Sequence, residues 1–212
     1  GDFVSVTRFQ VMLVGVGGQG VLAAAQILGM AAHAEGKPVV IGQLHGMSQR
    51  GGSVRCTAIF GGAESSHTAG PEMDVVVSFE PLEALRAVPE MGPATRVVTN
   101  THVMLPFQAV FENTDIPGPE AVVSTLQGIA GQVHVLDAPA LVGAVGETRT
   151  LNVLMLGAAS GLGLLPVGEG ALLEATTERC GQKFAHLNRK AFLLGRDAFA
   201  AEPTRAREAT VQ

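Results

Sequence analysis

Residues 9–20 read FQVMLVGVGGQG, and this stretch decides the fold that the sequence predicts. Residues 9–14 form an apolar run of the length of a buried strand, and they lead directly into a glycine-rich turn. An Ala-rich helical pattern follows at 21–34, and Gly36 and Pro38 end it. A strand, a glycine turn and a helix in this order are typical of the first unit of an α/β sheet protein.

Apolar runs and helical patterns alternate along the rest of the chain. We expect strands at 38–41, 53–60, 74–79, 96–100 and 133–137, and helices at 81–87, 120–130, 152–164 and 179–201. Loops are expected at 42–52 and 61–72, and an irregular excursion at 101–119. No internal repeat or linker interrupts the pattern. The sequence therefore predicts one α/β domain over residues 1–212, with three layers, an open, mostly parallel Rossmann-like sheet and a long C-terminal helix. Its ordered core is expected at about 8–200, before a polar tail.

The composition excludes several classes of protein. The 212 residues are 47% hydrophobic and only 16% charged, which excludes a disordered chain and indicates an apolar surface of the kind a partner covers. The net charge is −5 and there is no Lys/Arg block, so no nucleic-acid partner is expected. The longest apolar stretch, 153–165, is shorter than the ~18–20 residues of a membrane span. No secretory signal precedes the first strand, so we expect a cytoplasmic protein without membrane contact.

The cysteines and histidines predict no metal site. Cys56 and Cys180 cannot hold an iron–sulfur cluster alone, and neither has a histidine at zinc-ligand spacing. We expect both as reduced thiols. His67, His102 and His134 share no metal-ligand spacing either.

The first candidate motif is the glycine turn. Gly15, Gly17 and Gly20 fit G-x-G-x-x-G, a turn that brings the backbone and a helix N-terminus close to a diphosphate. A dinucleotide site also requires an acidic residue at the end of the second strand, where this chain has none, and Glu35 precedes that strand. The turn alone leaves three interpretations open: a dinucleotide site, a site for another phosphate or coenzyme, and a tight turn without a ligand.

The second candidate motif is HGMSQRGG at 45–52. It follows the second strand, so we expect it at the carboxyl edge of the sheet beside the glycine turn, where α/β proteins bind ligands. Arg50 can bind an anionic group through two parallel hydrogen bonds. His45 is a candidate acid or base near neutral pH, although a lone histidine is also often simply hydrogen-bonded.

The remaining polar residues receive structural interpretations. Glu80 and Glu83 are expected on a solvated helix start, and Asp137 at a strand end. Asn152 opens an apolar helix and is interpreted as its N-cap, with a side chain that faces a ligand or partner as the alternative.

Together these stretches resemble a known family. Residues 15–22, GVGGQGVL, followed by HGMSQRGGSV at 45–54, resemble the gamma-type domain of 2-oxoacid:ferredoxin oxidoreductases, and most closely the small (beta) subunits of indolepyruvate ferredoxin oxidoreductases. The likeness continues in the same order with SFEPLEALR at 78–86, with Asp137 and Ala138, with 152–157 and with NRKAF at 188–192. It covers most of the chain, from about residue 9 to 199.

The resemblance implies an obligate heteromer. In this family a large (alpha) subunit binds thiamine diphosphate and carries [4Fe–4S] clusters. The complex oxidatively decarboxylates a 2-oxoacid, here an arylpyruvate, transfers the acyl group to coenzyme A and passes electrons to ferredoxin. The small subunit holds no cluster and is expected to be inactive alone.

The resemblance also assigns candidate residues. His45 is the catalytic candidate, and Ser48, Gln49 and Arg50 are candidates for polar contacts to coenzyme A or the partner. The candidates for coenzyme binding are Gly15, Gly17, Gly18, Gln19, Gly20, Gly46, Met47, Ser48, Gln49, Arg50, Gly51 and Gly52. Leu44 stands where the resemblance leads us to expect a charged or polar residue before the histidine, a departure that concerns either the substrate preference or only the packing at the interface. The alternatives are a stand-alone NAD(P)- or flavin-dependent oxidoreductase, a non-enzymatic coenzyme-binding regulator, and a homodimer of the isolated chain.

Overall fold

The computed structural model describes residues 8–45, 52–61, 73–104 and 117–200. They form an open sheet of six strands in the order β2-β3-β1-β4-β5-β6. The strands are β1 (Phe9–Val16), β2 (Val39–His45), β3 (Ser53–Phe60), β4 (Val75–Ser78), β5 (Arg96–Asn100) and β6 (Gln132–Leu136). β1, β4, β5 and β6 run parallel, while β3 is antiparallel to both β1 and β2. The predicted open, mostly parallel sheet is confirmed.

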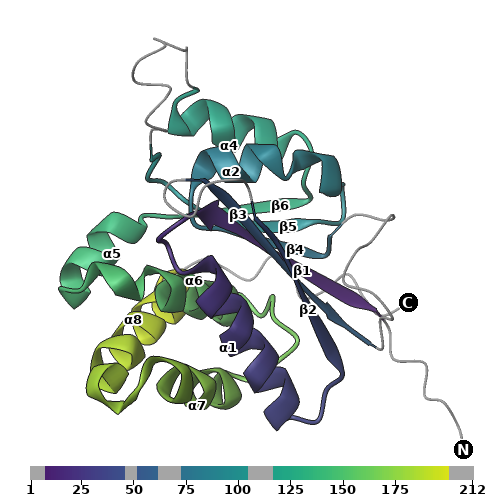
Figure 1. Ribbon diagram of the computed structural model, residues 1–212. Helices are drawn as coiled ribbons and strands as arrows, with labels where there is room; N and C mark the ends of the chain where they lie inside the picture. The colour runs from purple at the N-terminus through teal and green to yellow at the C-terminus, as the bar shows by residue number, and fades with distance from the viewer. Residues whose placement is uncertain (1–7, 46–51, 62–72, 105–116, 201–212) are drawn as a thin grey trace, which may run out of the picture.

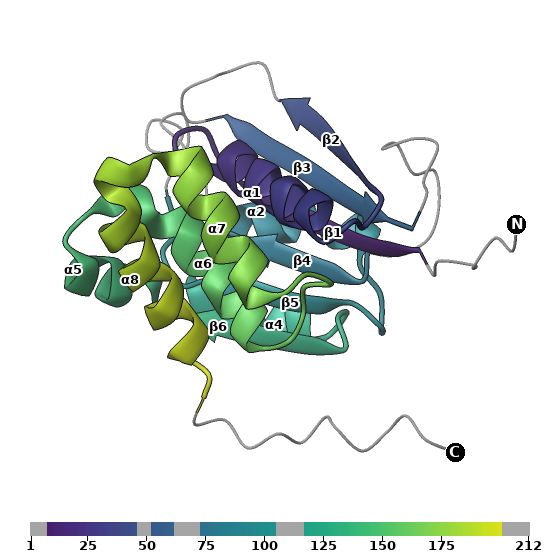
Figure 2. The same ribbon diagram turned by 90° about the horizontal axis from the view of Figure 1, so that it is seen from below.

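Helices cover both faces of the sheet, which confirms the predicted three layers (Figures 1 and 2). One face carries α1, α6, α7 and α8, with α5 beside them, and the other carries α2 and α4. The helices are α1 (Val21–Ala34), α2 (Pro81–Arg86), α4 (Pro119–Gln127), α5 (Ala138–Val145), α6 (Leu151–Gly161), α7 (Glu169–Cys180) and α8 (Ala185–Asp197). Short 3-10 turns lie at η1 (Val88–Glu90), η2 (Thr148–Thr150) and η3 (Gln182–Phe184). None of the described helices has the combination of length and hydropathy that crossing a bilayer requires.

β1 lies between the two halves of the core. Successive side chains of a strand point to opposite faces, so Val11 and Leu13 pack in the cluster under α1 and α6, and Met12 and Val14 in the cluster under α2 and α4. All four side chains are at most 2% exposed. This two-sided burial explains why the sequence of β1 is apolar throughout instead of alternating.

The C-terminal helical region departs from the prediction of one helix over 179–201. Instead α7 ends at Cys180, and Gly181 follows with φ +82°, a left-handed value that an L side chain rarely adopts. α8 begins only at Ala185. The predicted start of the C-terminal helix was therefore wrong, because Gly181 ends one helix and turns the chain into the next. α5 and α7 were not predicted.

The second strand is longer than predicted. β2 continues to His45 because Gly42, Gln43 and Leu44 pair with β3, so the expected loop over 42–52 begins only after His45. The expected loop at 61–72 lies outside the described residues after Gly61, and the excursion at 101–119 lies outside them at 105–116.

Candidate functional site

The glycine turn between β1 and α1 requires its glycines for backbone reasons. Gly18 and Gly20 adopt φ +100° and +80°, which strain any other residue. A Cβ at Gly15 would lie 2.7 Å from Gln19 Oε1 and 3.1 Å from Phe79 Cβ, so no side chain fits there. Gly15 therefore packs closely against Gln19 and Phe79, while Gly18 and Gly20 present backbone without a side chain at the N-terminus of α1.

Gln19 holds this turn in place. Its Oε1 accepts the N–H of Val16 at 2.9 Å, and its Nε2 donates to the Phe79 carbonyl at 3.1 Å and contacts Met104 Sδ at 3.2 Å. The side chain thus links the ends of β1 and β4 to the segment after β5. Its predicted contact with a coenzyme stays a prediction.

The second motif ends beside the glycine turn and begins at β2, on the other side of β3. His45 closes β2 opposite Val54, and the carbonyl of Gly52 accepts the N–H of Gly17 at 2.8 Å. The remaining candidates of this motif, Gly46, Met47, Ser48, Gln49, Arg50 and Gly51, lie outside the described residues. Only the backbone of His45 is described. The expected roles of all of them stay predictions.

Glu80 and Glu83 were predicted on a solvated helix start, and this prediction was wrong. Glu80 is only 1% exposed and Glu83 only 3%. Glu80 caps α2, accepting the N–H of Glu83 at 2.9 Å, and it also accepts the N–H of Met104 at 3.0 Å. Glu83 accepts the hydroxyl of Ser53 at 2.5 Å and pairs with Arg86 Nη1 at 2.5 Å. The two buried carboxyl groups thus join segments that lie far apart in the sequence.

The burial of Glu80 has an electrostatic consequence. Burial raises the pKa of Glu80, and the neighbouring Glu83 carboxylate raises it further, although backbone N–H donors oppose this shift. Through Glu80 and Glu83 the ends of β3, β4 and β5 are held together. Ser53 directly follows Gly52, so this network also fixes the end of the second motif.

A cavity of about 900 Å³ opens at the carboxyl edge of the sheet. Its walls come from the glycine turn, the segment after β5, the start of α5, and η2 with the start of α6 (Figure 1). The lining residues are Gly17, Gly18, Gln19, Gly20, Ala23, Asn100, His102, Met104, Ala138, Pro139, Val142, Gly143, Gly146, Glu147, Thr148, Arg149, Leu151 and Asn152. The structure thus brings Gly17, Gly18, Gln19 and Gly20 of the predicted set into one cavity, while Gly15 packs beneath the turn.

Sequence reasoning missed much of this cavity. Asn100 is the last residue of β5, His102 and Met104 follow it, and Ala138 and Pro139 follow β6. Because ligands of such sheets bind outside the carboxyl ends of the strands, extending the search to these two strand ends would have found them. Asp137, which was placed at a strand end, follows β6 and caps α5 by accepting the N–H of Ala140 at 3.3 Å.

Asn152 was interpreted as an N-cap, and this was wrong. Thr150 occupies that position, and Asn152 is the second residue of α6. Its side chain is buried and lines the cavity, which agrees with the alternative of a residue that faces a ligand or partner.

The cavity suits an anionic ligand with an apolar part. No side chain in the described ranges caps the N-terminus of α1, which lies at the cavity, whereas α6 continues from η2, whose Thr148 carbonyl accepts the N–H of Leu151. The dipole of α1 favours a negative charge at its N-terminus. Pro139, Val142 and Leu151 supply apolar wall.

Arg149 adds a cation at the rim of the cavity. Its side chain is largely exposed and pairs with Glu147 at 2.8 Å, and this guanidinium lowers the pKa of Glu147 to about 2. Nowhere in the described ranges do three or more His, Cys, Asp or Glu side chains gather as metal ligands.

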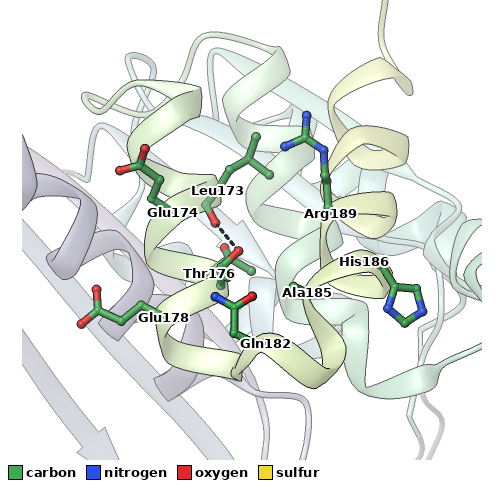
Figure 3. Close-up of a pocket in the computed structure, with 9 residues that line it drawn as sticks. Leu173, Glu174, Thr176, Glu178, Gln182, Ala185, His186 and Arg189 are labelled. Carbon is green, nitrogen blue, oxygen red and sulfur yellow. Dashed lines mark hydrogen bonds between the residues drawn. The ribbon is translucent and has the colours of Figure 1, made fainter.

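A second cavity, of about 520 Å³, lies between α7 and α8 (Figure 3). Leu173, Glu178 and Arg189 are among its lining residues, and the Leu173 carbonyl accepts the hydroxyl of Thr177 at 3.1 Å. Its walls come from α7, η3 and α8 alone, without a strand end or glycine turn. We therefore place the candidate site at the sheet edge.

Known proteins resemble this chain over nearly its whole length. The family described as pyruvate ferredoxin/flavodoxin oxidoreductase matches residues 10–198. A protein named indolepyruvate oxidoreductase subunit IorB from Methanothermobacter thermautotrophicus is 35% identical over 194 residues, covering 92% of this chain and 97% of its own. A protein of the same name from Archaeoglobus fulgidus is 31% identical, covering 89% and 94%.

Two solved structures share the fold. The gamma subunit of a keto/oxoacid ferredoxin oxidoreductase from Geobacter sulfurreducens superposes with a TM-score of 0.65 at 22% identity, covering 91% of this chain and 99% of that subunit. The 2-oxoglutarate:ferredoxin oxidoreductase of Magnetococcus marinus, solved with 2-oxoglutarate, coenzyme A and succinyl-CoA bound, gives a TM-score of 0.69 at 19% identity. The likeness covers 94% of this chain and 32% of that longer one.

Proposed function

Because the chain belongs to the pyruvate ferredoxin/flavodoxin oxidoreductase family, we propose that it is the small subunit of a heteromeric 2-oxoacid:ferredoxin oxidoreductase. The complex would oxidatively decarboxylate an arylpyruvate such as indolepyruvate. In the net reaction the 2-oxoacid loses CO₂, two electrons pass to ferredoxin, and the acyl group joins the thiol of coenzyme A. The observation that carries this proposal is the 35% identity to an indolepyruvate oxidoreductase subunit over 97% of that relative's length.

The described residues do not fit the redox centres of such a complex. Cys56 is buried in β3 and Cys180 ends α7, so they offer no set of thiolates for an iron–sulfur cluster. The described carboxylates also form no metal-binding group of the kind that a magnesium-bound diphosphate requires. We therefore assign thiamine diphosphate and the [4Fe–4S] clusters to a large partner subunit. A cytoplasmic location of the complex is a separate part of the proposal.

The described residues do fit coenzyme A as a co-substrate. Its phosphates would lie at the N-terminus of α1, where Gly17, Gly18 and Gly20 expose backbone. Its pantetheine arm would follow the apolar wall formed by Val142 and Leu151. This chain would bind and orient the coenzyme and exclude water around it. Arg50, Ser48 and Gln49 are proposed as further contacts, and His45 as the acid–base candidate.

A stand-alone dinucleotide-dependent oxidoreductase is the alternative, and the structure gives it little support. Neither β2 nor the residues up to Gly52 contain a carboxylate that could bind a ribose. Glu35 precedes β2, where it accepts the N–H of Gly168 at 2.8 Å and pairs with Lys37 at 2.7 Å. It is held at the end of the sheet opposite to the cavity.

Isolation of the chain from its native cell by a mild affinity tag tests the proposal. We expect a large subunit to co-purify, with the broad visible absorbance of iron–sulfur clusters and a dye reduction that requires both a 2-oxoacid and coenzyme A. A panel of indolepyruvate, phenylpyruvate, pyruvate and 2-oxoglutarate then identifies the substrate, with indolepyruvate expected to give the highest kcat/KM. A colourless chain that arrives alone would overturn the proposal. Saturable NADH binding by that chain would instead favour the dinucleotide alternative. A stable homodimer would favour the alternative in which the isolated chain pairs with itself.

A further inference from the structure

Three asparagines are buried in the described ranges, and one of them, Asn152, has a buried side-chain oxygen without a hydrogen-bond partner. Asn100 donates from Nδ2 to the Phe79 carbonyl at 3.1 Å and accepts the N–H of His102 at 3.2 Å. Asn188 donates to the Phe184 carbonyl at 3.1 Å. Asn152 is 95% buried, since its exposed fraction is 5%, and its Oδ1 has no partner. A buried carbonyl oxygen without a partner destabilises the folded chain and is rare in native proteins.

The position of Asn152 links its amide to the candidate site. It is the second residue of α6 and lines the cavity together with the glycine turn. A Cβ added to Gly20 would lie 3.0 Å from both Cγ and Nδ2 of Asn152, so the amide packs directly against the turn that begins α1. The unpaired amide therefore lies where the N-termini of α1 and α6 meet the cavity.

We propose that Asn152 determines specificity by hydrogen-bonding a neutral amide of the ligand in this cavity, next to the phosphates. This inference rests on the proposed coenzyme A site. The N-terminus of α1 serves an anion, whereas the unpaired Oδ1 of Asn152 is an acceptor that matches the N–H of an amide. The pantetheine arm of coenzyme A carries two such amides. An unpaired amide in the free protein is thus kept for a partner that arrives with the ligand.

The substitution Asn152→Leu separates this role from a structural one. Leucine has the same branching and number of side-chain heavy atoms and removes a buried oxygen that lacks a partner, so the thermal midpoint of the full chain should stay the same or rise. Calorimetric titration of the complex with coenzyme A should show an affinity at least about tenfold weaker than in wild type, because the ligand's amide then loses its partner in a buried site. Adenosine 3′,5′-bisphosphate, which has phosphates but no pantetheine arm, should bind both forms equally.

Asn100→Leu is the matched control for stability. Asn100 lines the same cavity, but its amide is paired on both sides, so this variant should lower the thermal midpoint where Asn152→Leu does not. If Asn152→Leu fails to fold, the amide is structural and the proposal is overturned; unchanged affinity in Asn152→Ala would overturn it as well.

The outcomes also separate this inference from the proposed function. A wild-type complex that binds no coenzyme A contradicts the proposed coenzyme site itself, and the role of Asn152 falls with it. Equal affinity of wild type and Asn152→Leu for coenzyme A overturns only the role of Asn152. An equal loss of affinity for adenosine 3′,5′-bisphosphate also overturns it, because Asn152 would then contact the nucleotide end.

Discussion

Gly195→Ala should strongly destabilise the chain, because α6 and α8 cross in direct backbone contact at glycines. A Cβ at Gly195 would lie 2.0 Å from the Leu154 carbonyl oxygen, and one at Gly157 would lie 2.1 Å from that of Phe192. Both glycines are buried, and the obstacle in each case is backbone, which cannot rotate away as a side chain can. Alanine at either position therefore forces the two helices apart.

The size of the effect follows from these distances. A carbon atom approaches a carbonyl oxygen to roughly 3.3 Å at closest, so α8 must move about 1.3 Å from Leu154 to accept the new methyl group. Overpacking of a core costs about 1–3 kcal/mol, and a backbone obstacle places Gly195→Ala at about 3 kcal/mol. For a domain of this size that energy corresponds to a decrease in Tm of roughly 6–12 °C.

Thermal unfolding followed by far-UV circular dichroism measures this decrease. Gly170→Ala in α7 is the matched control, because no heavy atom lies within 4 Å of its added Cβ. This control should keep or raise the Tm, since alanine favours a helix over glycine by up to about 1 kcal/mol. A Tm of Gly195→Ala within about 2 °C of wild type would refute the reasoning from backbone contact.

Three further predictions concern the buried polar groups. Ser53→Ala removes a hydrogen bond to the buried Glu83 carboxylate and should lower the free energy of unfolding by about 1.5–3 kcal/mol in urea titration. Wild type should be more stable relative to Glu80→Gln at about pH 5 than at about pH 8. The raised folded-state pKa of Glu80 stabilises the folded chain below that pKa, and this stabilisation is lost as the pH rises through it. Urea titrations with the opposite trend would contradict the burial argument. Burial raises the pKa of Cys56 to about 11. A disulfide reagent at about pH 8 should therefore modify the partly exposed Cys180 first, and Cys56 only after unfolding. Equal rates of modification would contradict this order.

The sheet and the position of the glycine turn could be predicted because local sequence determines both. The apolar run of β1, the turn residues and the Ala-rich α1 each favour the same strand–turn–helix unit. α7 escaped prediction although Leu172, Ala175 and Thr176 are buried at helical spacing. Its remaining positions are mostly polar, and Gly181 was not recognised as a helix end. A weak apolar pattern therefore hid a helix that the tertiary contacts of a few residues stabilise.

The polar residues of the site could not be predicted in the same way. Glu80 and Glu83 look like an ordinary charged helix start, and only the arrival of Ser53 and Met104 from other segments buries them and supplies donors. Asn152 likewise has the residue type of an N-cap, but its environment is set by Gly20, far away in the sequence. Burial and pairing of polar groups are properties of the tertiary structure, which residue type and spacing do not encode.

The glycine motif has a structural explanation of its own. Gly15 is required by the side chains of Gln19 and Phe79, and Gly18 and Gly20 are required by their positive φ angles, so the chain needs these glycines with or without a ligand. G-x-G-x-x-G here is therefore weak support for any particular nucleotide. The discriminating features lie around the turn: the missing carboxylate after β2 disfavours a dinucleotide, and the unpaired amide of Asn152 favours a ligand that carries an amide. The missing carboxylate directs the next experiment to coenzyme A before NADH, whereas Asn152 does not separate the two, because nicotinamide also carries an amide.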